Sequence, residues 1–409
     1  MNSAPKSLRL HIGIFGRRNA GKSSLLNAIT RQNVSIVSDV AGTTTDPVEK
    51  PMELLPIGPV LFIDTAGIDD EGALGQLRID KTRRVFDRCE LGVIVAPAGQ
   101  WASFEISILE EMRKREIPAV VVFSKKDLAT PDEAVIESVR ALGVEVVFTN
   151  AATREGILDL REALIRIAPE EFMMAPPVAG DLIKGGDTVV LVVPIDKEAP
   201  KGRLMNPQVQ TIRDLLDHDA VALVVKEREL RHALEQLKNP PALVITDSQA
   251  FLKVAADTPI GTPITSFSIL FSRAKGDLAE FVRGARAIDN LKSGARILIA
   301  EACSHHPIGE DIGRVKIPRW LQQYVGGSMT FVHYQGHDFP DDLAKFDLVI
   351  HCGSCALNRR AMLSRIAQCK EAGVPITNYG MCIAYTLGVF ERALEPFPAA
   401  MEAYREALK

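Results

Sequence analysis

The sequence predicts an α/β protein, because short apolar strand-like runs alternate with helical patterns along most of its 409 residues. Two further features divide the chain. A glycine-rich phosphate-binding motif lies near the N-terminus, and a cluster of cysteines and histidines lies in the last quarter. A chain of this length has room for about two to four domains. We predict domains at 1–170, 181–265 and 266–409, with a linker at 171–180 between the first two.

Composition and charge exclude several classes of protein. The formal net charge is −4 and no block of lysine and arginine stands out, which argues against a nucleic-acid partner. The apolar runs are too short to span a bilayer, and the first residues lack the pattern of a secretory signal. We therefore expect a cytoplasmic protein without a membrane partner, whose six cysteines serve metal or redox chemistry rather than disulfides.

A phosphate-binding loop is predicted at residues 16–23, GRRNAGKS, between an apolar strand at 8–15 and a helix at 22–30. Its glycines let backbone N–H groups surround phosphate oxygens, and the helix N-terminus adds partial positive charge. In such loops the lysine, here Lys22, reaches the β- and γ-phosphates and the hydroxyl of Ser23 binds Mg²⁺. The nucleotide contacts predicted here are Gly16, Asn19, Ala20, Gly21, Lys22, Ser23 and Ser24.

Four more motifs follow this loop, each at the position that a guanine-nucleotide site requires. A first switch, GTTTD, lies at 42–46. The segment DTAG, which contains Asp64 and Gly67, follows a strand at 60–63. The Asp64 carboxylate at this strand end can join the Mg²⁺ shell. Lys125 and Asp127 follow a strand at 119–123, and Asp127 can accept the guanine N1 and N2 hydrogens. The backbone at Asn150 and Ala151, after a strand at 144–148, can reach the guanine O6. The order of the five motifs predicts a Ras-like domain that binds GTP and GDP.

The switch segment SDVAGTTTDPV at 38–48, together with Asn19, resembles the tRNA-modification and Era-like (TrmE/Era-like) branch of GTPases. The resemblance implies a K⁺ ion held by Asn19 and by the Ser38 and Val40 carbonyls, where other GTPases use an arginine finger. A charge at that place is worth roughly 10³–10⁵ in rate. The same resemblance implies that Thr44 joins the Mg²⁺ shell.

Three departures from the usual GTPase pattern lead us to expect slow hydrolysis. Ile68 stands where many GTPases keep a glutamine that orients the attacking water. Gln76 matches the position of a switch II glutamate in the tRNA-modification relatives, with Asp69, Asp70 and Glu71 as nearby alternatives. Ser124 replaces the usual asparagine before Lys125, which predicts looser guanine binding. We expect slow, K⁺-stimulated GTP hydrolysis that depends on Lys22, Thr44, Asp64, Gly67 and Gln76.

Residues 181–265 predict a small parallel sheet with a core of its own. Apolar strands at 188–195, 220–225 and 243–246 alternate with helical patterns at 207–216, 230–237 and 249–256. This segment contains no cofactor motif or catalytic motif, so the residues alone assign it no function.

The last segment predicts a metal site where two strands end. Cys303 and His305 follow a strand at 296–300, and His351, Cys352 and Cys355 follow a strand at 347–351. Clusters at strand ends can meet at the carboxyl edge of one sheet. We expect Gly353 to permit the tight turn that brings Cys352 and Cys355 to one ion.

The residue types leave the metal open. Three cysteines and a histidine suit a structural zinc ion, and Cys352 with Cys355 alone would suit a redox dithiol. An iron–sulfur cluster normally takes four thiolates, so its fourth position would fall to His305, His351, Glu301 or an external ligand. The histidines equally suit a role in orienting the ligands. The remaining cysteines, Cys89, Cys369 and Cys382, are expected to be core thiols.

A GTPase of this branch followed by Cys-x-His, a long spacer and His-Cys-x-x-Cys resembles the HydF family of [FeFe]-hydrogenase maturation GTPases over the full length of the chain. The stretch 187–216 is similar to that family's dimerisation domain, which implies a homodimer. The resemblance implies a scaffold that binds a [4Fe–4S] cluster through Cys303, Cys352 and Cys355, with an exchangeable fourth ligand. It also implies a transient diiron precursor, assembled with two radical-SAM maturases and delivered to the apo-[FeFe]-hydrogenase. The alternative is an RNA- or ribosome-directed, K⁺-dependent GTPase with a structural zinc domain.

Overall fold

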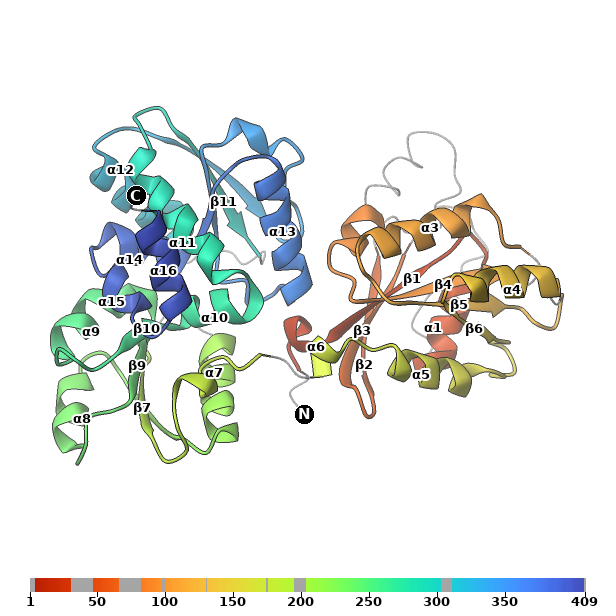
Figure 1. Cartoon of the computed structure of the whole chain (residues 1–409), viewed down its shortest axis with the longest axis horizontal. Helices are drawn as coiled ribbons and strands as arrows, with labels where there is room; N and C mark the ends of the chain where they lie inside the picture. The colour runs from red at the N-terminus through yellow and green to blue at the C-terminus, as the bar shows by residue number, and fades with distance from the viewer. Residues whose placement is uncertain are drawn as a thin grey trace. The chain divides into compact units, whose positions relative to one another are not determined.

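The computed structural model describes residues 4–30, 47–65, 82–97, 100–129, 131–173, 176–194, 204–302 and 311–407. The chain forms two compact units, Met1–Ala175 and Pro176–Lys409. One β-sheet lies in the first unit and two lie in the second (Figure 1). None of the helices within the described ranges is long and apolar enough to cross a membrane.

The first unit is built on a six-stranded sheet in the order β2-β3-β1-β4-β5-β6, in which only β2 runs antiparallel. Apolar side chains on both faces form two buried clusters, as expected for a sheet covered by helices on both sides. This arrangement confirms the predicted P-loop α/β domain. The strands are β1 (Leu10–Phe15), β2 (Val48–Leu54), β3 (Gly58–Asp64), β4 (Leu91–Pro97), β5 (Ala119–Ser124) and β6 (Glu145–Phe148). The described helices are η1 (Lys6–Leu8), α1 (Lys22–Thr30), α3 (Ser103–Lys114), α4 (Glu133–Ala141), α5 (Ile157–Arg166) and α6 (Glu170–Met173).

Glu49 on the edge strand β2 binds two cations. Its carboxylate accepts hydrogen bonds from Lys6 and from Arg88, the latter at 2.5 Å. Burial alone would raise the pKa of Glu49, but the bonds to Lys6 and Arg88 outweigh it and lower the pKa to about 2. Because the folded pKa lies below the unfolded value, the stabilisation exists above that value and disappears as the pH falls towards the folded pKa.

Replacing Glu49 with glutamine is expected to destabilise the first unit by about 1–3 kcal/mol at neutral pH, because Lys6 and Arg88 lose their hydrogen bonds to a charged carboxylate. The loss should shrink as the pH falls from 4.5, where the unfolded chain begins to take up a proton at Glu49, towards about 2, where the folded chain takes one up as well. Urea unfolding followed by Trp101 fluorescence in a Trp320→Phe background measures it. Glu53→Gln, which neutralises an exposed carboxylate on the same strand, is the control. An equal loss at neutral pH and at pH values near 2 would contradict the role of the ion pairs.

The second unit contains two parallel four-stranded sheets, with strand orders β10-β9-β7-β8 and β12-β11-β13-β14. The first sheet consists of β7 (Thr188–Val192), β8 (Val221–Val225), β9 (Leu243–Thr246) and β10 (Ile264–Ser266). The second consists of β11 (Arg296–Glu301), β12 (Thr330–Gln335), β13 (Leu348–His351) and β14 (Ile376–Asn378). The helices are α7 (Asn206–Asp217), α8 (Leu230–Gln236), α9 (Phe251–Asp257), α10 (Phe267–Lys275), α11 (Leu278–Arg286), α12 (Ile317–Val325), α13 (Arg359–Glu371), α14 (Tyr379–Thr386), α15 (Phe390–Leu394) and α16 (Pro398–Glu406). The short helical segments are η2 (Gly180–Leu182), η3 (Ser248–Ala250), η4 (Ala287–Asn290), η5 (Ile312–Lys316) and η6 (Leu343–Lys345).

The two sheets of the second unit share one continuous cluster of buried apolar side chains, which includes residues of α10 and α11. The separate core expected for 181–265 is therefore not observed, although alternating strands and helices form the parallel sheet predicted there. The predicted boundary at 265/266 falls just before α10, and the domain boundaries stay a prediction.

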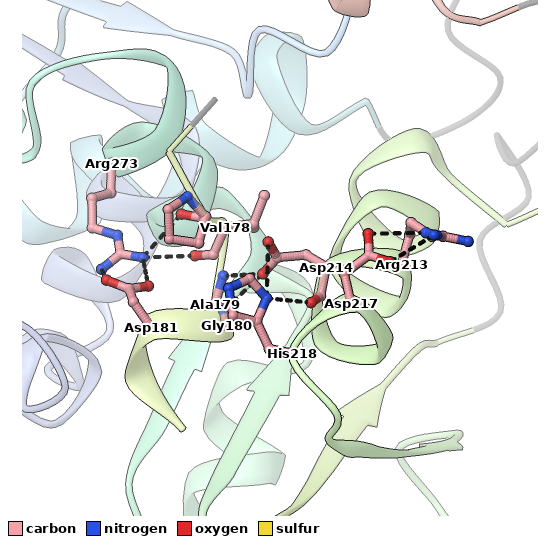
Figure 2. A network of polar contacts seen from close by, with 10 residues as sticks. Val178, Ala179, Gly180, Asp181, Arg213, Asp214, Asp217, His218 and Arg273 are labelled. Carbon is pink, nitrogen blue, oxygen red and sulfur yellow. Dashed lines mark hydrogen bonds and ion pairs between the residues drawn. The ribbon is translucent and has the colours of Figure 1, made fainter. Parts of the chain in front are cut away.

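The segment that enters the second unit is fastened by side chains of α7 and α10 (Figure 2). Asp214 accepts hydrogen bonds from the N–H groups of Ala179 and Gly180, both at 2.7 Å. Arg273 pairs with Asp181 at 2.9 Å and also donates to two backbone carbonyls of this segment. The second half of the predicted linker at 171–180 is thus bound to the second unit.

Helix α11 lies directly against β14, and Gly284 makes this approach possible. A Cβ atom at Gly284 would lie 1.9 Å from the carbonyl oxygen of Ile376, which is backbone and cannot rotate away. Glycine-to-alanine changes inside helices usually stabilise by about 0.5–1 kcal/mol. At Gly284 we expect the opposite effect, a loss of stability on replacement by alanine.

We expect Gly284→Ala to destabilise the second unit by about 1–3 kcal/mol, the usual cost of overpacking. Trp320 fluorescence during urea unfolding, in a Trp101→Phe background, reports on this unit. Arg283→Ala, at an exposed position of the same helix, should have a small effect. A more stable Gly284→Ala protein would show that α11 is free to move away from the sheet.

Candidate functional site

The phosphate-binding loop connects β1 to α1 and encloses a buried positive charge. Lys22 is 7% exposed, and its ammonium donates to the carbonyls of Gly16 and Arg17, each at 2.8 Å. The loop thus presents a lysine at the helix N-terminus, as a site for phosphate groups requires.

Two contacts from other elements fix the loop. Arg17 pairs with Glu105 of α3 through two hydrogen bonds of 2.8 and 3.0 Å, and Glu105 is fully buried. The hydroxyl of Ser124, at the end of β5, donates to the carbonyl of Ala20 at 2.6 Å. Asn19 has a φ of 58°, a conformation that asparagine tolerates better than most residues. Ser124 therefore ties the base-binding strand to the loop, and its predicted effect on guanine affinity stays a prediction.

Ser23 and Asp64 lie together where α1 begins and β3 ends. The Ser23 hydroxyl donates to Asp64 Oδ2 at 2.7 Å, while the buried Oδ1 atom has no hydrogen-bond partner among the described residues. Burial raises the pKa of Asp64, and the Ser23 hydrogen bond and the Lys22 charge oppose that shift. A hydroxyl beside a carboxylate oxygen without a partner fits the oxygen ligands that Mg²⁺ prefers.

The two predicted guanine-binding segments meet at the same sheet edge. The N–H of Lys126 donates to the carbonyl of Thr149 at 3.3 Å, and the Asn150 side chain accepts from the N–H of Ala152 at 3.0 Å. These contacts hold the two loops that follow β5 and β6. The predicted base contacts on them are Lys125, Asp127, Asn150 and Ala151.

Several predicted site residues lie outside the described ranges, and their roles stay predictions. They are Ser38, Val40, Thr44, Gly67, Ile68, Asp69, Asp70, Glu71, Gln76, Cys303 and His305.

The second candidate site lies at the carboxyl edge of the second unit's sheet β12-β11-β13-β14. Strands β11 and β13 are parallel neighbours, so both end at the same edge of one sheet. The N–H of Ala302, directly before Cys303, donates to Cys352 Sγ at 3.0 Å. Cys352 and Cys355 are only partly buried, whereas Cys89, Cys369 and Cys382 are buried. The fold therefore brings the start of the Cys303 segment to the Cys352 thiol.

His351 at the end of β13 is fully buried and both of its ring nitrogens are engaged. Arg365 of α13 donates to Nε2 at 2.7 Å, so Nδ1 carries the proton and donates to the Cys352 carbonyl at 2.9 Å. Burial, followed by the charge of Arg365, lowers the pKa of His351 to about 3. A metal-ligand role for His351 would require one of these hydrogen bonds to break.

Glu301 at the end of β11 is 2% exposed and also has partners. Its carboxylate accepts hydrogen bonds from Gln335 at 2.9 Å and Tyr379 at 3.3 Å, and Arg314 lies 3.6 Å away. Within the described ranges no three His, Cys, Asp or Glu side chains lie close enough together to hold a metal. Cys303 and His305, the other predicted ligands, lie outside these ranges.

The turn between the two thiols differs from the expected one. The residue in the left-handed conformation is Ser354, with a φ of 54°, and not Gly353. Ser354 is 4% exposed, and its hydroxyl contacts the Cys352 carbonyl at 3.3 Å and Met362 Sδ at 3.0 Å. Side-chain contacts thus accompany a Ser354 conformation that most residues avoid.

The Cys352 thiol is harder to deprotonate than an ordinary cysteine. Burial raises the pKa of Cys352 to about 11, although the N–H groups of Ala302 and Ser354 oppose the shift. Because metals bind the thiolate, positive charge near the sulfur favours ligation. The structure supplies Lys275 and Arg365, whose charges both act on the thiols of this loop, and the sequence analysis identified neither. No motif marks these two residues, so spacing along the chain could not have found them.

Comparison with known families divides the chain in the same order as its sheets. Residues 11–125 match the 50S ribosome-binding GTPase family, residues 178–276 the hydrogen maturase F dimerization domain, and residues 279–396 the hydrogen maturase F tetramerization domain. The sheet edge that carries Cys352 and Cys355 falls within the match to the tetramerization domain.

Curated relatives match the N-terminal part. A tRNA modification GTPase MnmE from Synechococcus sp. is 38% identical over 162 residues, which are 39% of this chain and 34% of that protein. GTPase Der from Wolinella succinogenes is 35% identical over 34% of this chain and 29% of its own length. The chain thus spans about a third of these relatives. A solved structure of Era from Aquifex aeolicus aligns with 56% of this chain and 98% of its own, at 19% identity and a TM-score of 0.36. The GTPase domain followed by the two maturase domains shows that the chain belongs to the hydrogen maturase F (HydF) family.

Proposed function

We propose that this protein is a scaffold for [FeFe]-hydrogenase maturation. It would bind and slowly hydrolyse GTP, hold a [4Fe–4S] cluster with an exchangeable fourth ligand, and deliver a diiron precursor to the apo-hydrogenase. The observation that carries the proposal is the Ala302–Cys352 contact, because the residue directly before Cys303 lies at the Cys352 thiol within a HydF-family chain.

The nucleotide site would work mainly by positioning and by charge. Lys22 would release its loop carbonyls and bind the β- and γ-phosphates, while Ser23 and Asp64 would complete the Mg²⁺ shell with Thr44. Asn19 and the carbonyls of Ser38 and Val40 would hold K⁺ beside the transferred phosphate. Gly67 and Gln76 would lie at the attacking water.

The metal site would take its thiolates from Cys303, Cys352 and Cys355. When bound, the cluster would supply an iron whose fourth position accepts an exchangeable group, and so a place to attach a second metal centre. The residues fit such a cluster, since an N–H group already donates to Cys352 Sγ at 3.0 Å. His305 or an external ligand is favoured for the fourth position, because His351 and Glu301 already have hydrogen-bond partners.

Self-association would build the working scaffold. The chain carries dimerization and tetramerization domains of its family. Strand β8 is the edge of its sheet, and Val221 and Val224 on it are 54% and 42% exposed. We propose that a second copy pairs along this edge to form a homodimer, and that two radical-SAM maturases load the assembled scaffold.

A second function that the sequence allows is that of an RNA- or ribosome-directed GTPase with a structural zinc domain. The relative named as a tRNA modification GTPase matches 39% of this chain. One zinc ion per chain and salt-sensitive RNA binding would favour this second function.

The delivery assay tests the first function. The full chain, co-expressed with two radical-SAM maturases and purified without oxygen, is mixed with apo-[FeFe]-hydrogenase, and hydrogen evolution is measured. We expect activity only with protein that was exposed to both maturases. A cluster-loaded protein that never activates the hydrogenase would overturn the carrier role.

A further inference from the structure

A buried lysine lies beneath the loop that carries the two thiols. Lys275, the last residue of α10, is 6% exposed. Its ammonium donates to the carbonyls of Ser354 and Leu357, at 3.2 and 3.1 Å. Both carbonyls belong to the loop between β13 and α13 that contains Cys352 and Cys355.

Other contacts fix the end of α10. Arg359, the first residue of α13, donates to the carbonyls of Ala274 and Gly276, which flank Lys275, at 3.1 and 3.2 Å. Two residues earlier, Arg273 is bound to Asp181 (Figure 2). The helix end is therefore tied to the thiol loop on one side and to the entering segment on the other. The lysine is held in one place before any metal arrives.

The carbonyls that bind the Lys275 ammonium carry no full negative charge. Among the described residues no carboxylate pairs with it, and the groups that favour its charged form are the thiols of Cys355 and Cys352. Burial lowers the pKa of Lys275 to about 8, with the two thiols opposing the shift. Burying a cation without a counter-charge is costly.

We infer that Lys275 is a further positioning residue of the metal site, whose ammonium anchors the Cys352–Cys355 loop and offsets the negative charge of its thiolates and of the anionic cluster they would hold. The inference rests on the proposed function. A cluster bound through thiolates becomes more negative when it is reduced, and a nearby cation stabilises that added charge. Lys275 should therefore raise the reduction potential of the cluster and slow its loss.

Four variants of the full chain separate charge from anchoring. Lys275→Met removes both, Lys275→Gln keeps N–H donors for the carbonyls but no charge, and Lys275→Arg keeps both. Lys238→Met, at an exposed position of the same unit, is the control. Each protein is reconstituted with iron and sulfide, and its midpoint potential is followed by EPR. Cluster loss to an iron chelator is followed by absorbance, and circular dichroism checks the fold.

We expect the Met and Gln variants to have more negative midpoint potentials than the wild type and to lose iron roughly tenfold faster or more, in line with loss of a residue that supports metal ligands. The Arg and Lys238→Met variants should match the wild type. A Gln variant with the wild-type midpoint potential and the wild-type rate of iron loss would show that Lys275 acts only through its hydrogen bonds, and would overturn the charge role. A loaded wild type indistinguishable from both neutral variants would overturn this inference alone. A wild type that takes up no iron would overturn the proposed function as well.

Discussion

Replacing Cys352 with serine is expected to abolish cluster loading while leaving GTP hydrolysis unchanged. Cys352 is the thiol that already accepts the Ala302 N–H, at the point where β11 and β13 end side by side. A serine hydroxyl would stay protonated in this buried place and would not replace a thiolate. The loss of bound iron should exceed the roughly 10–100-fold effect typical of a residue that only supports a ligand.

Cys369→Ala is the matched control for this change. It also removes one thiol, but Cys369 is buried in α13 among apolar side chains. Its iron content should stay close to that of the wild type. Iron and sulfide are measured after anaerobic reconstitution, and GTP turnover is measured on the same samples. Equal loss of turnover and iron in Cys352→Ser would contradict two separable sites.

Replacing Lys22 with alanine should have the converse effect. Lys22 supplies the buried ammonium of the phosphate loop, so its loss should reduce GTP turnover by about 10²–10³-fold or more, as removal of one preorganised charged or polar donor typically does. Iron and sulfide content should stay at the wild-type level, because the thiol loop belongs to the other unit.

Lys114→Ala, at an exposed position of α3, is the control for the Lys22 change. Steady-state GTP hydrolysis in K⁺ buffer and nucleotide binding by fluorescence are measured for both proteins. Normal turnover in Lys22→Ala would mean that GTP is hydrolysed elsewhere in the chain.

Much of the fold was readable from the sequence, because its strands are short apolar runs that end at motifs. The helix expected at 22–30 and the strand expected at 243–246 appear with those bounds. That the strands before the two ligand clusters share one sheet was also foreseen, whereas their direct adjacency was not. Helix α10 was missed, because its sequence FSILFSRAK is apolar on most sides and shows no clear periodicity. Strand β12, whose residues are mostly half-buried, was missed as well.

The chemical environment of the thiols was less predictable. Lys275 lies far from Cys352 in sequence, and only the packing of α10 under the loop brings their charges together. Arg365 determines which nitrogen of His351 carries the proton, and no sequence motif predicts that pairing. Glycine at position 353 suggested where the chain would turn, yet contacts of the Ser354 hydroxyl placed the left-handed residue one position later. Contacts between residues far apart in the sequence cannot be predicted from the local spacing of residue types.

The metal content of the full chain tests the central claim most directly. Iron, sulfide and zinc are measured after anaerobic reconstitution, and an EPR spectrum is recorded after reduction with dithionite. The scaffold function predicts about four irons and four sulfides per chain with a reduced-cluster signal, the composition of a [4Fe–4S] centre. A signal that changes on addition of imidazole would show that the fourth position exchanges. One zinc ion per chain without iron would contradict the claim and leave a GTPase with a structural metal domain.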